Sequence, residues 1–377
     1  MPKNIFSLSD ARALAKWRMP KMMFDYIDGS AGNETACDLN CSALQKIRLL
    51  PRVLVNTERR NLGKTLFDRH WPLPFGVAPM GMCDLTWPGA DAMLANAAKN
   101  FDIPLVLSTM ASSSIETTRN RAGENAWFQL YVGESEEVAD DLVDRAEASG
   151  YEVLILTVDV PEIGARPREQ RNGFQAPLRI GARQFLDFAI HPQWSLTTLL
   201  KGVPRLANVS PSAGSRKFQR NENRGRVDWH YLDRLRKRWS GKLIVKGVLG
   251  PEDAVRIRDA DVDAVYVSNH GGRQLDSAPA AIQMLPLIRA AVGAGYPLLF
   301  DSGIRDGECV LKALALGADF VFLGRPLLYA MGALGDRGLT EMIELISRQI
   351  DIALAQLGCP DINDIDSSLI FREGGDI

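Results

Sequence analysis

The sequence predicts a closed (β/α)8 TIM barrel with an N-terminal helical extension and one long insertion between its fourth and fifth strands. Short β-branched apolar runs alternate with segments of helical period, a pattern typical of βα units and a parallel sheet. About eight such runs fit into the 377 residues, which favours a closed barrel over an open doubly wound sheet. Polar residues follow several of the runs, and barrels gather such residues at their catalytic mouth.

The predicted strands lie between positions 75 and 323 of the chain. In chain order they are 75–78, 105–108, 127–131, 153–159, 243–246, 264–268, 298–301 and 320–323. Helices with one apolar face are predicted between them, among them 136–149, 251–260, 279–292 and 307–317. A last helix over 339–357 carries an apolar stripe, so we expect it to pack against the barrel or a neighbouring subunit.

Two regions fall outside this repeat, although we expect the whole chain, 1–377, to be one domain. Residues 1–70 are predicted as helices and loops that precede the barrel. Residues from about 170 to 242 form the insertion, including a polar run over 210–226. Because the insertion shows no clear period, we expect a lid, a docking segment or disorder there.

The composition argues against several classes of protein. A net charge of −2 leaves no basic footprint for nucleic acid. Five scattered cysteines indicate free thiols in a reducing compartment, and Cys37 and Cys41 lack the second ligand pair that a zinc site needs. Neither a signal-peptide pattern nor an apolar run of about 20 residues occurs, so we expect a cytoplasmic protein with no metal.

Residues 268–276, S-N-H-G-G-R-Q-L-D, form the most informative segment. They follow a predicted buried strand, so His270 and Arg273 arrive together at one strand end. Histidine can take up a proton near neutral pH, and arginine can hold an anion. The two glycines between them permit a sharp turn and the close approach of a flat ligand. This pattern favours deprotonation of a small carboxylate beside a planar cofactor over an ordinary polar turn.

The loops after the seventh and eighth strands predict a phosphate site. They read D-S-G-I-R at 301–305 and G-R at 324–325. Barrels bind phosphate at these two loops, where glycine exposes N–H donors and arginine supplies charge. No G-x-G-x-x-G follows the first strand and no phosphate loop of the nucleotide-hydrolysing type occurs, so a nicotinamide site is not expected. The sequence therefore predicts a different phosphate-bearing cofactor.

With further segments in the same order, the chain resembles the FMN-dependent α-hydroxy-acid dehydrogenase and oxidase family over nearly its whole length. Those segments are L-S-T at 107–109, F-Q-L-Y at 128–131, L-T-V-D at 156–159, V-K-G at 245–247 and L-G-R-P at 323–326. The resemblance implies an FMN-binding barrel that oxidises a small 2-hydroxy acid to the 2-oxo acid. It also implies a homotetramer.

The resemblance assigns roles at the reaction site. His270 is the expected base, which takes a proton as two electrons pass to flavin N5. Asp159 is the carboxylate expected to hold the imidazole and to raise its pKa in the reduced complex. Tyr131 joins them as a catalytic residue. The substrate-binding residues are expected to be Tyr26, Tyr131, Arg166 and Arg273.

The resemblance also implies the residues that hold the flavin. Lys246 is expected beside N1 and O2 of the ring, where a fixed positive charge favours the anionic reduced form. The other contacts are expected along the ring edge, the N5 side and the ribityl phosphate. They are Pro79, Met80, Gly81, Ser108, Gln129, Thr157, Ser268, Asp301, Gly303, Arg305, Gly324 and Arg325.

Gly81 bears on the electron acceptor. Oxidases of the family commonly have alanine at this position and mandelate-type dehydrogenases have glycine. A dehydrogenase that passes electrons to a quinone, a cytochrome or another carrier is therefore favoured over an oxidase that uses O2. A barrel that binds FMN without redox chemistry is a further alternative, and the presence of His270, Asp159 and both arginines argues against it.

Substrate and membrane contact are the least constrained features. Met110 stands where glycolate oxidase-like members carry a bulky aromatic residue, so an (S)-2-hydroxy acid such as L-lactate or a larger mandelate-like acid is expected. The insertion mixes apolar and basic residues and is expected either to dock peripherally on an anionic membrane or to cover the site. These residues are Phe185, Leu186, Phe188, Trp194, Leu199 and Leu200, with Arg179, Arg183, Lys201 and Arg205 nearby.

Overall fold

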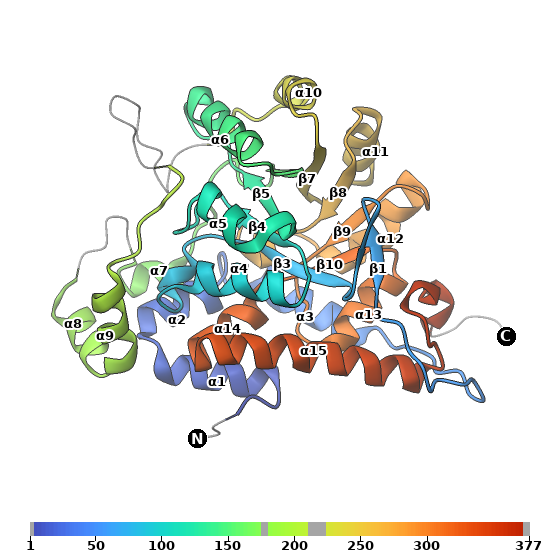
Figure 1. Ribbon diagram of the computed structural model, residues 1–377, viewed down its shortest axis with the longest axis horizontal. Coiled ribbons are helices and arrows are strands. Elements are labelled where there is room, and N and C mark those ends of the chain that lie inside the picture. The colour runs from blue at the N-terminus through green and yellow to red at the C-terminus, as the bar shows by residue number, and fades with distance from the viewer. Residues whose placement is uncertain (1–3, 175–179, 210–223, 372–377) are drawn as a thin grey trace.

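A computed structural model describes residues 4–174, 180–209 and 224–371 of the chain, and its centre is a closed barrel of eight parallel strands (Figure 1). The predicted fold class is confirmed. Each strand pairs with the next along the chain, and the last pairs with the first. The strands are β3 (Phe75–Met80), β4 (Leu105–Ser108), β5 (Ala126–Leu130), β6 (Val153–Thr157), β7 (Lys242–Val248), β8 (Ala264–Val267), β9 (Leu298–Phe300) and β10 (Phe320–Leu323).

The predicted strand boundaries differ from the observed ones by a few residues. The polar residues Asp159, Ser268 and Asp301 lie in the loops just beyond β6, β8 and β9, not inside the strands. Leaving the strand frees these side chains from the alternation of the pleat, so all three turn toward the barrel mouth. Four further predicted site residues lie on the strands themselves. The strand register places Ser108 beside Gln129 and Thr157 beside Lys246.

Helices surround the barrel, and side chains at their first turns explain where several begin. Ser135 accepts a hydrogen bond from the backbone N–H of Val138, and Asp306 accepts one from Cys309. The surrounding helices are α4 (Ala90–Asn100), α5 (Ile115–Ala122), α6 (Glu136–Ala148), α10 (Trp229–Arg238), α11 (Pro251–Asp259), α12 (Ala281–Val292), α13 (Gly307–Ala315), α14 (Arg325–Leu334) and α15 (Asp336–Leu357).

The N-terminal extension is helical, as predicted, and lies beside the C-terminal helices (Figure 1). It comprises α1 (Leu8–Arg18), α2 (Lys21–Asp28) and α3 (Thr35–Lys46). Helix α1 packs against α14, and α14 packs against α15. Helix α2 thereby carries Tyr26 to the barrel mouth.

A short hairpin closes the opposite end of the barrel. It comprises β1 (Lys64–Leu66) and β2 (Arg69–Trp71), and only helices and loops were predicted for this region. Three-residue strands are too short to show a period of two in the sequence. The ring of Trp71 lies 6.1 Å from that of Trp127 and 6.4 Å from that of Phe320, so the hairpin plugs the barrel floor with aromatic side chains.

The insertion between β6 and β7 contains helices, so the absence of a clear period in the sequence was misleading. They are α7 (Pro167–Arg171), α8 (Ala182–Ala189) and α9 (Pro192–Lys201), and α10 leads into β7. The helices are short, and although the sequence of α8 is strongly amphipathic, the helix buries none of its side chains, so its apolar stripe does not face the core. Arg179 and positions 210–223 of the predicted polar run lie outside the described residues.

No helix in the described part of the chain combines the length and the apolar character needed to cross a bilayer.

Candidate active site

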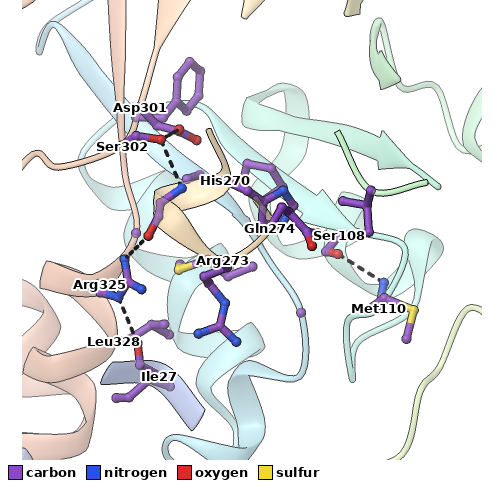
Figure 2. A pocket seen from close by; sticks show the side chains of 18 of the residues that line it. Ile27, Ser108, Met110, His270, Arg273, Gln274, Asp301, Ser302, Arg325 and Leu328 are labelled. Atoms are coloured by element: carbon purple, nitrogen blue, oxygen red, sulfur yellow. Dashed lines mark hydrogen bonds between the residues drawn. The ribbon is translucent and has the colours of Figure 1, made fainter. Parts of the chain in front are cut away.

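The carboxyl ends of the barrel strands surround one large cavity, which Figure 2 shows from close by. It encloses about 1180 Å³ of space, a figure that includes its open mouth. Fifteen of the predicted site residues line it: Tyr26, Pro79, Met80, Gly81, Ser108, Tyr131, Arg166, Lys246, His270, Arg273, Asp301, Gly303, Arg305, Gly324 and Arg325. The other four, Gln129, Asp159, Thr157 and Ser268, lie directly behind that lining, in contact or in strand register with it.

His270 is held between a carboxylate and a phenol. Its Nδ1 lies 3.0 Å from Asp159 Oδ1, and its Nε2 lies 3.3 Å from the hydroxyl of Tyr131. A carboxylate accepts hydrogen bonds, so Nδ1 carries the proton and donates to Asp159. The lone pair of Nε2 therefore faces the cavity and can accept a proton.

The backbone at His270 explains the two glycines that follow it. His270, Gly271 and Gly272 all have positive φ, at 58°, 63° and 78°. Glycine adopts this region without cost, whereas histidine does so at an energetic cost. A Cβ at Gly272 would lie 2.5 Å from the backbone nitrogen of Cys37, so the turn is also pressed against α3. The result is an imidazole directed into the cavity at a fixed position.

Burial decides the protonation of the imidazole. Desolvation lowers the pKa of His270, and the attraction of Asp159 only partly offsets it. The attraction of Asp159 raises the histidine pKa in this structure, but the net pKa still lies below the ordinary value. Burial also raises the pKa of Tyr131, with Asp159 adding to the effect, so the phenol stays protonated at neutral pH.

Arg166 and Arg273 meet at one carboxylate that the sequence reasoning missed. Glu169 Oε1 lies 3.3 Å from Arg166 Nη1 and 3.0 Å from Arg273 Nη2. Glu169 is only 4% exposed, so it offsets part of the repulsion between two buried guanidinium groups. Burial and the charge of Arg166 lower the pKa of Arg273 to about 9. The sequence did contain a signal for the contact between Arg166 and Glu169, because the two residues are three positions apart, about one helical turn.

Arg273 is also anchored to the N-terminal extension. Its Nη1 donates to the backbone oxygens of Tyr26, at 2.9 Å, and Gly29, at 2.6 Å. Tyr26 in turn donates its hydroxyl to the carbonyl of Gly81, 3.0 Å away, and its ring stacks on Phe174. These contacts fix the phenol and the guanidinium on the same side of the cavity.

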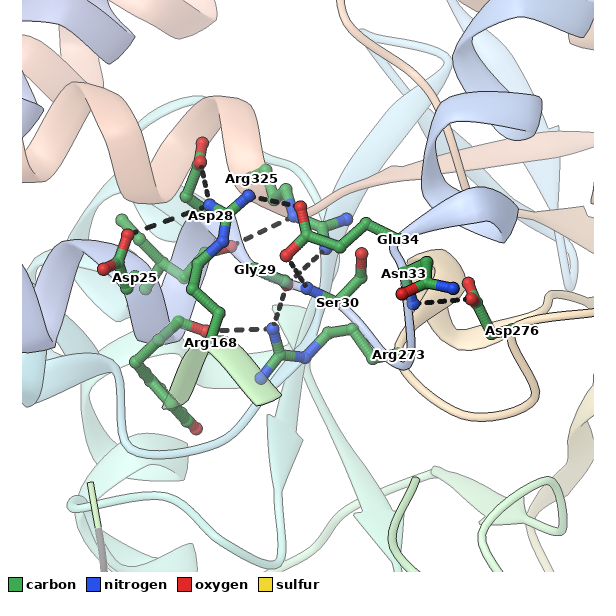
Figure 3. A network of polar contacts seen from close by, with 12 residues as sticks. Asp25, Asp28, Gly29, Ser30, Asn33, Glu34, Arg168, Arg273, Asp276 and Arg325 are labelled. Carbon is green, nitrogen blue, oxygen red and sulfur yellow. Dashed lines mark hydrogen bonds and ion pairs between the residues drawn. The ribbon is translucent and has the colours of Figure 1, made fainter. Parts of the chain in front are cut away.

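A network of ion pairs locks the N-terminal extension to the loop that carries Arg166 (Figure 3). Arg168 pairs with Asp28 at 2.6 Å and also with Glu34, and Arg12 approaches Asp28 at 2.6 Å. Burial alone would raise the pKa of Asp28, but hydrogen bonds from Arg12 and Tyr329 outweigh it and lower the pKa to about 2. The sequence reasoning did not find this network, because its members are far apart in the chain.

Lys246 lies at the centre of the cavity floor and is 3% exposed. Its Nζ donates to Ser268 Oγ at 2.8 Å and lies 3.3 Å from Asp301 Oδ2. Ser268 donates to Asp301 Oδ1 at 2.6 Å. The ammonium group is therefore fixed in place, with a serine and a carboxylate satisfying part of its hydrogen-bonding capacity.

Two buried polar atoms near the cavity indicate that a ligand is expected there. Gln129 Nε2 and Thr157 Oγ1 have no hydrogen-bond partner within the described part of the chain. Leaving such groups unsatisfied costs about 1–3 kcal/mol each. Both side chains point from strands of the barrel wall next to Ser108 and Lys246, so a planar group with polar edges fits the site.

The other end of the cavity carries the predicted phosphate loops, and Figure 2 shows Arg325 there. Arg325 donates to the carbonyls of Ile27, Gly29 and Gly271, so its guanidinium mainly holds three loops together. The backbone N–H groups at the start of α14 and the side chain of Arg305 are then the groups best placed for a phosphate. FMN, with a polar ring edge and a phosphate tail, fits both ends of the cavity.

One further guanidinium lines the cavity and was not predicted. Arg224 lies at the end of the insertion, and its Cζ is 4.6 Å from the ring centroid of Tyr131. No sequence motif marks this arginine, because the segment around it is rich in arginine throughout.

The fold and the cavity together define a barrel oxidoreductase with a flavin mononucleotide site. Residues 15–372 match the family described as FMN-dependent dehydrogenase, and the chain belongs to that family. It is therefore an FMN-dependent 2-hydroxy-acid dehydrogenase, as the resemblance implied.

Relatives and solved structures agree along nearly the full length. (S)-mandelate dehydrogenase of Pseudomonas putida is 40% identical over 99% of this chain and 96% of that protein. L-lactate dehydrogenase of Pseudomonas syringae pv. syringae is 37% identical over 98% of this chain and 99% of that protein. A crystal structure of the monotopic membrane protein (S)-mandelate dehydrogenase aligns with a TM-score of 0.94 at 39% identity, covering 98% of this chain and 100% of that one.

Proposed function

We propose that this enzyme oxidises an (S)-2-hydroxy acid of the L-lactate or mandelate type to its 2-oxo acid, with His270 as the base. The observation that carries the proposal is the placement of an imidazole lone pair and two guanidinium groups on one cavity. The names of the relatives, mandelate dehydrogenase and L-lactate dehydrogenase, support this substrate class.

The proton step follows from the contacts of His270. Nε2 accepts a proton from the substrate, while Nδ1–H remains hydrogen-bonded to Asp159. The carboxylate stabilises the imidazolium that forms, because opposite charges attract strongly in a buried site. Tyr131, protonated and 3.3 Å from Nε2, donates a hydrogen bond to the substrate oxygen.

Arg166 and Arg273 bind the substrate carboxylate. Arg166 Nε is buried and has no hydrogen-bond partner among the described residues, so it can donate to a ligand. Arg273 approaches from the side of Tyr26 and keeps its contact with Glu169. Two forks at fixed positions orient the carboxylate and thereby present the hydroxyl-bearing carbon to His270.

FMN, when bound, supplies a two-electron acceptor at N5. Ser108, Gln129, Thr157, Lys246 and Ser268 are proposed to hold the ring. The backbone of Pro79, Met80 and Gly81 is proposed to lie along it. The fixed ammonium of Lys246 favours negative charge on the ring. The ribityl phosphate is proposed to be held by Asp301, Gly303, Arg305, Gly324 and Arg325.

We propose that a quinone or another carrier, not O2, takes up the electrons. Gly81 supports this, since oxidases of the family commonly carry alanine at this position, and here a Cβ would lie 2.9 Å from Met110 Cβ. An oxidase that forms hydrogen peroxide is the alternative. The rate at which air restores the yellow colour after anaerobic reduction separates the two.

We also propose that the insertion docks on the inner face of an anionic membrane. Leu186 on α8 and Leu199 and Leu200 on α9 are exposed, Leu200 by 88%, with Arg183 and Lys201 close in sequence. Trp194 on α9 faces the other way and donates to the carbonyls of Leu85 and Thr86. One insertion can therefore cover the barrel mouth with one face and meet lipid with the other.

An anaerobic visible spectrum, taken before and after addition of substrate, tests the central proposal. Lactate or mandelate should bleach the bound flavin, and the S enantiomer should do so faster. If no 2-hydroxy acid in a broad panel bleaches a fully loaded enzyme, the proposed function is wrong. Light scattering of the same sample tests the homotetramer that we expect.

A further inference from the structure

An aromatic ring lies below Lys246, and the proposed contacts with the substrate and the cofactor do not explain it. Tyr266 on β8 and Lys246 on β7 are paired directly across the two strands. Residues paired in this way present their side chains on the same face of a sheet, here the inside of the barrel. The Nζ of Lys246 lies 5.0 Å from the centroid of the Tyr266 ring, which is within the range of a cation–π interaction.

Tyr266 belongs to the packed interior of the barrel. It is fully buried, and its ring lies 5.1 Å from that of Phe322, a residue that lines the cavity. Ile244 and Ala264 precede the pair by two positions on each strand and form the next inward-facing layer toward the barrel floor. The close packing of these neighbours therefore holds the Tyr266 ring directly below the cavity.

The polar contacts of Lys246 draw its ammonium group toward β8 and β9. Its Nζ donates to Ser268 Oγ at 2.8 Å and lies 3.3 Å from Asp301 Oδ2. A lysine side chain is long and flexible, so these contacts alone would let the ammonium group move toward the carboxylate and into the barrel. The Tyr266 ring occupies the space below and attracts the ammonium group from that side.

Tyr266 also interacts with the carboxylate of Asp301. Burial raises the pKa of Tyr266 well above its ordinary value, and the charge of Asp301 adds to the effect. The phenol is therefore protonated and carries no formal charge. The face of a neutral ring attracts a cation without neutralising it. Tyr266 can thus fix the position of Lys246 and leave its positive charge undiminished.

We propose that Tyr266 is a positioning residue that holds the Lys246 ammonium group against the flavin ring and thereby sets how readily the flavin accepts electrons. The inference rests on the proposed placement of the ring beside Lys246. A positive charge close to the ring stabilises the anionic reduced form more than the neutral oxidised form. Without the Tyr266 ring, the ammonium group moves toward Asp301 and away from the cavity, so the reduction potential of the bound flavin falls.

The test measures the reduction potential of the flavin in the FMN-loaded enzyme, without substrate, by anaerobic equilibration with a reference dye. Tyr266→Met removes the ring but keeps the barrel filled with a flexible apolar side chain. The equilibrium constant for reduction of the flavin by the dye should fall about tenfold, which corresponds to about 30 mV for a two-electron couple. Tyr266→Phe keeps the ring and should stay within about threefold of the wild type. Tyr266→Leu should give the same fall as Tyr266→Met and replaces it in the test if that variant does not fold.

Phe320→Met is the matched control. Phe320 on β10 is also fully buried inside the barrel, but its ring packs against Trp71 at the floor, 6.4 Å away. This variant loses an aromatic ring from the same core, so its Tm should fall to a similar extent. Its flavin potential should equal that of the wild type, because Lys246 keeps its aromatic contact.

A further variant, Lys246→Met, separates this inference from the proposed function. If Lys246→Met lowers the potential and Tyr266→Met does not, the inference is wrong and the proposed placement of the ring stands. If neither variant lowers it, the placement is wrong and the inference fails with it. No substrate enters the measurement, so a wrong substrate assignment cannot produce either result.

Two other results would also overturn the inference. If Phe320→Met lowers the potential as much as Tyr266→Met does, general packing of the core sets the potential. If Tyr266→Phe lowers it as much as Tyr266→Met does, the hydroxyl and not the ring is responsible. The flavin absorption spectrum and Tm of each variant show whether it is loaded and folded.

Discussion

The barrel mouth and the outer face of the insertion differ in opposite ways from the usual distribution of buried and exposed side chains. The mouth buries charge: Lys246, Glu169 and Asp301 are nearly inaccessible to solvent. The insertion exposes hydrocarbon on α8 and α9. In the mouth Lys246, Glu169 and Asp301 each have an opposite charge or a hydrogen bond within about 3.3 Å, which offsets the cost of their burial. We propose that these departures from ordinary burial mark two places where this protein meets other molecules, the substrate and cofactor at the mouth and a membrane at the insertion.

Replacing the proposed base should have the largest effect on activity, because it removes the proton acceptor at the barrel mouth without disturbing the packing there. In His270→Gln, the side chain can no longer take up the proton, so kcat should fall by about 10²- to 10⁴-fold. The flavin spectrum should be unchanged, because the cofactor contacts lie elsewhere. Steady-state kinetics with an artificial dye measure the effect. Retention of more than a tenth of the activity, or loss of FMN, would show that the role of His270 is misassigned.

Removing the carboxylate shared by the two arginines tests whether the buried charges of the mouth depend on one another. Glu169→Gln leaves two neighbouring guanidinium groups with less compensation, so unfolding free energy should fall by about 3 kcal/mol. A 2-oxo acid product should raise the Tm of this variant more than that of the wild type, because its carboxylate replaces the lost charge. Thermal melts with and without product measure this. Equal stabilisation of both proteins would contradict the shared role of Glu169.

The dependence of kcat/KM on pH tests the effect of burial at the barrel mouth, because burial sets the pKa of His270. Only neutral imidazole accepts a proton, and burial lowers the pKa of His270, so kcat/KM should rise with pH through a midpoint below about 6.5. Asp159 raises that pKa, so Asp159→Asn should move the midpoint lower still. It should also lower the plateau, because the imidazolium loses its partner. A midpoint that moves upward in this variant would refute the electrostatic assignment.

Substitutions in the insertion should have the smallest effect on catalysis, because they should change only the binding of the enzyme to a membrane. The triple variant Leu186→Ser, Leu199→Ser and Leu200→Ser removes apolar surface and should release the enzyme from anionic vesicles while dye-linked kcat stays within about twofold. Point substitutions are preferred to deletion of roughly 180–215, because Trp194 anchors α9 to the barrel. Leu287→Ser, an exposed leucine on α12, is the control and should bind vesicles as the wild type does. Wild-type protein that fails to bind anionic vesicles would remove the membrane proposal.

The sequence predicted the mouth far better than the insertion, for a physical reason. Buried parallel strands are short apolar runs, and the predicted site residues follow them within a few positions, as Ser268 and His270 follow β8. Such local patterns can be recognised in the amino-acid sequence alone. Glu169 also pairs with Arg166 three positions away, but its contact with Arg273, like that of Arg224 with Tyr131, joins residues about a hundred positions apart along the chain.

The hairpin and the helices of the insertion were not predicted from the sequence, for two different reasons. Strands β1 and β2 are too short for a periodic signal, and their stability comes from Trp71 packing into the barrel floor. Helices α8 and α9 have apolar residues that face outward, so the assumption that an apolar stripe faces the core gave no guidance. In both places tertiary contacts or an external surface decide the structure, and neither is visible in local sequence.

The aromatic plug of Trp71 has a consequence for the order of events in turnover. Since aromatic side chains fill the opposite end of the barrel, we expect the substrate and the proposed electron carrier both to approach the cofactor from the mouth. If both reactants use the same entrance, the 2-oxo acid leaves before the electron carrier approaches, and the two half-reactions alternate. Initial-rate plots against both reactants should therefore give parallel lines.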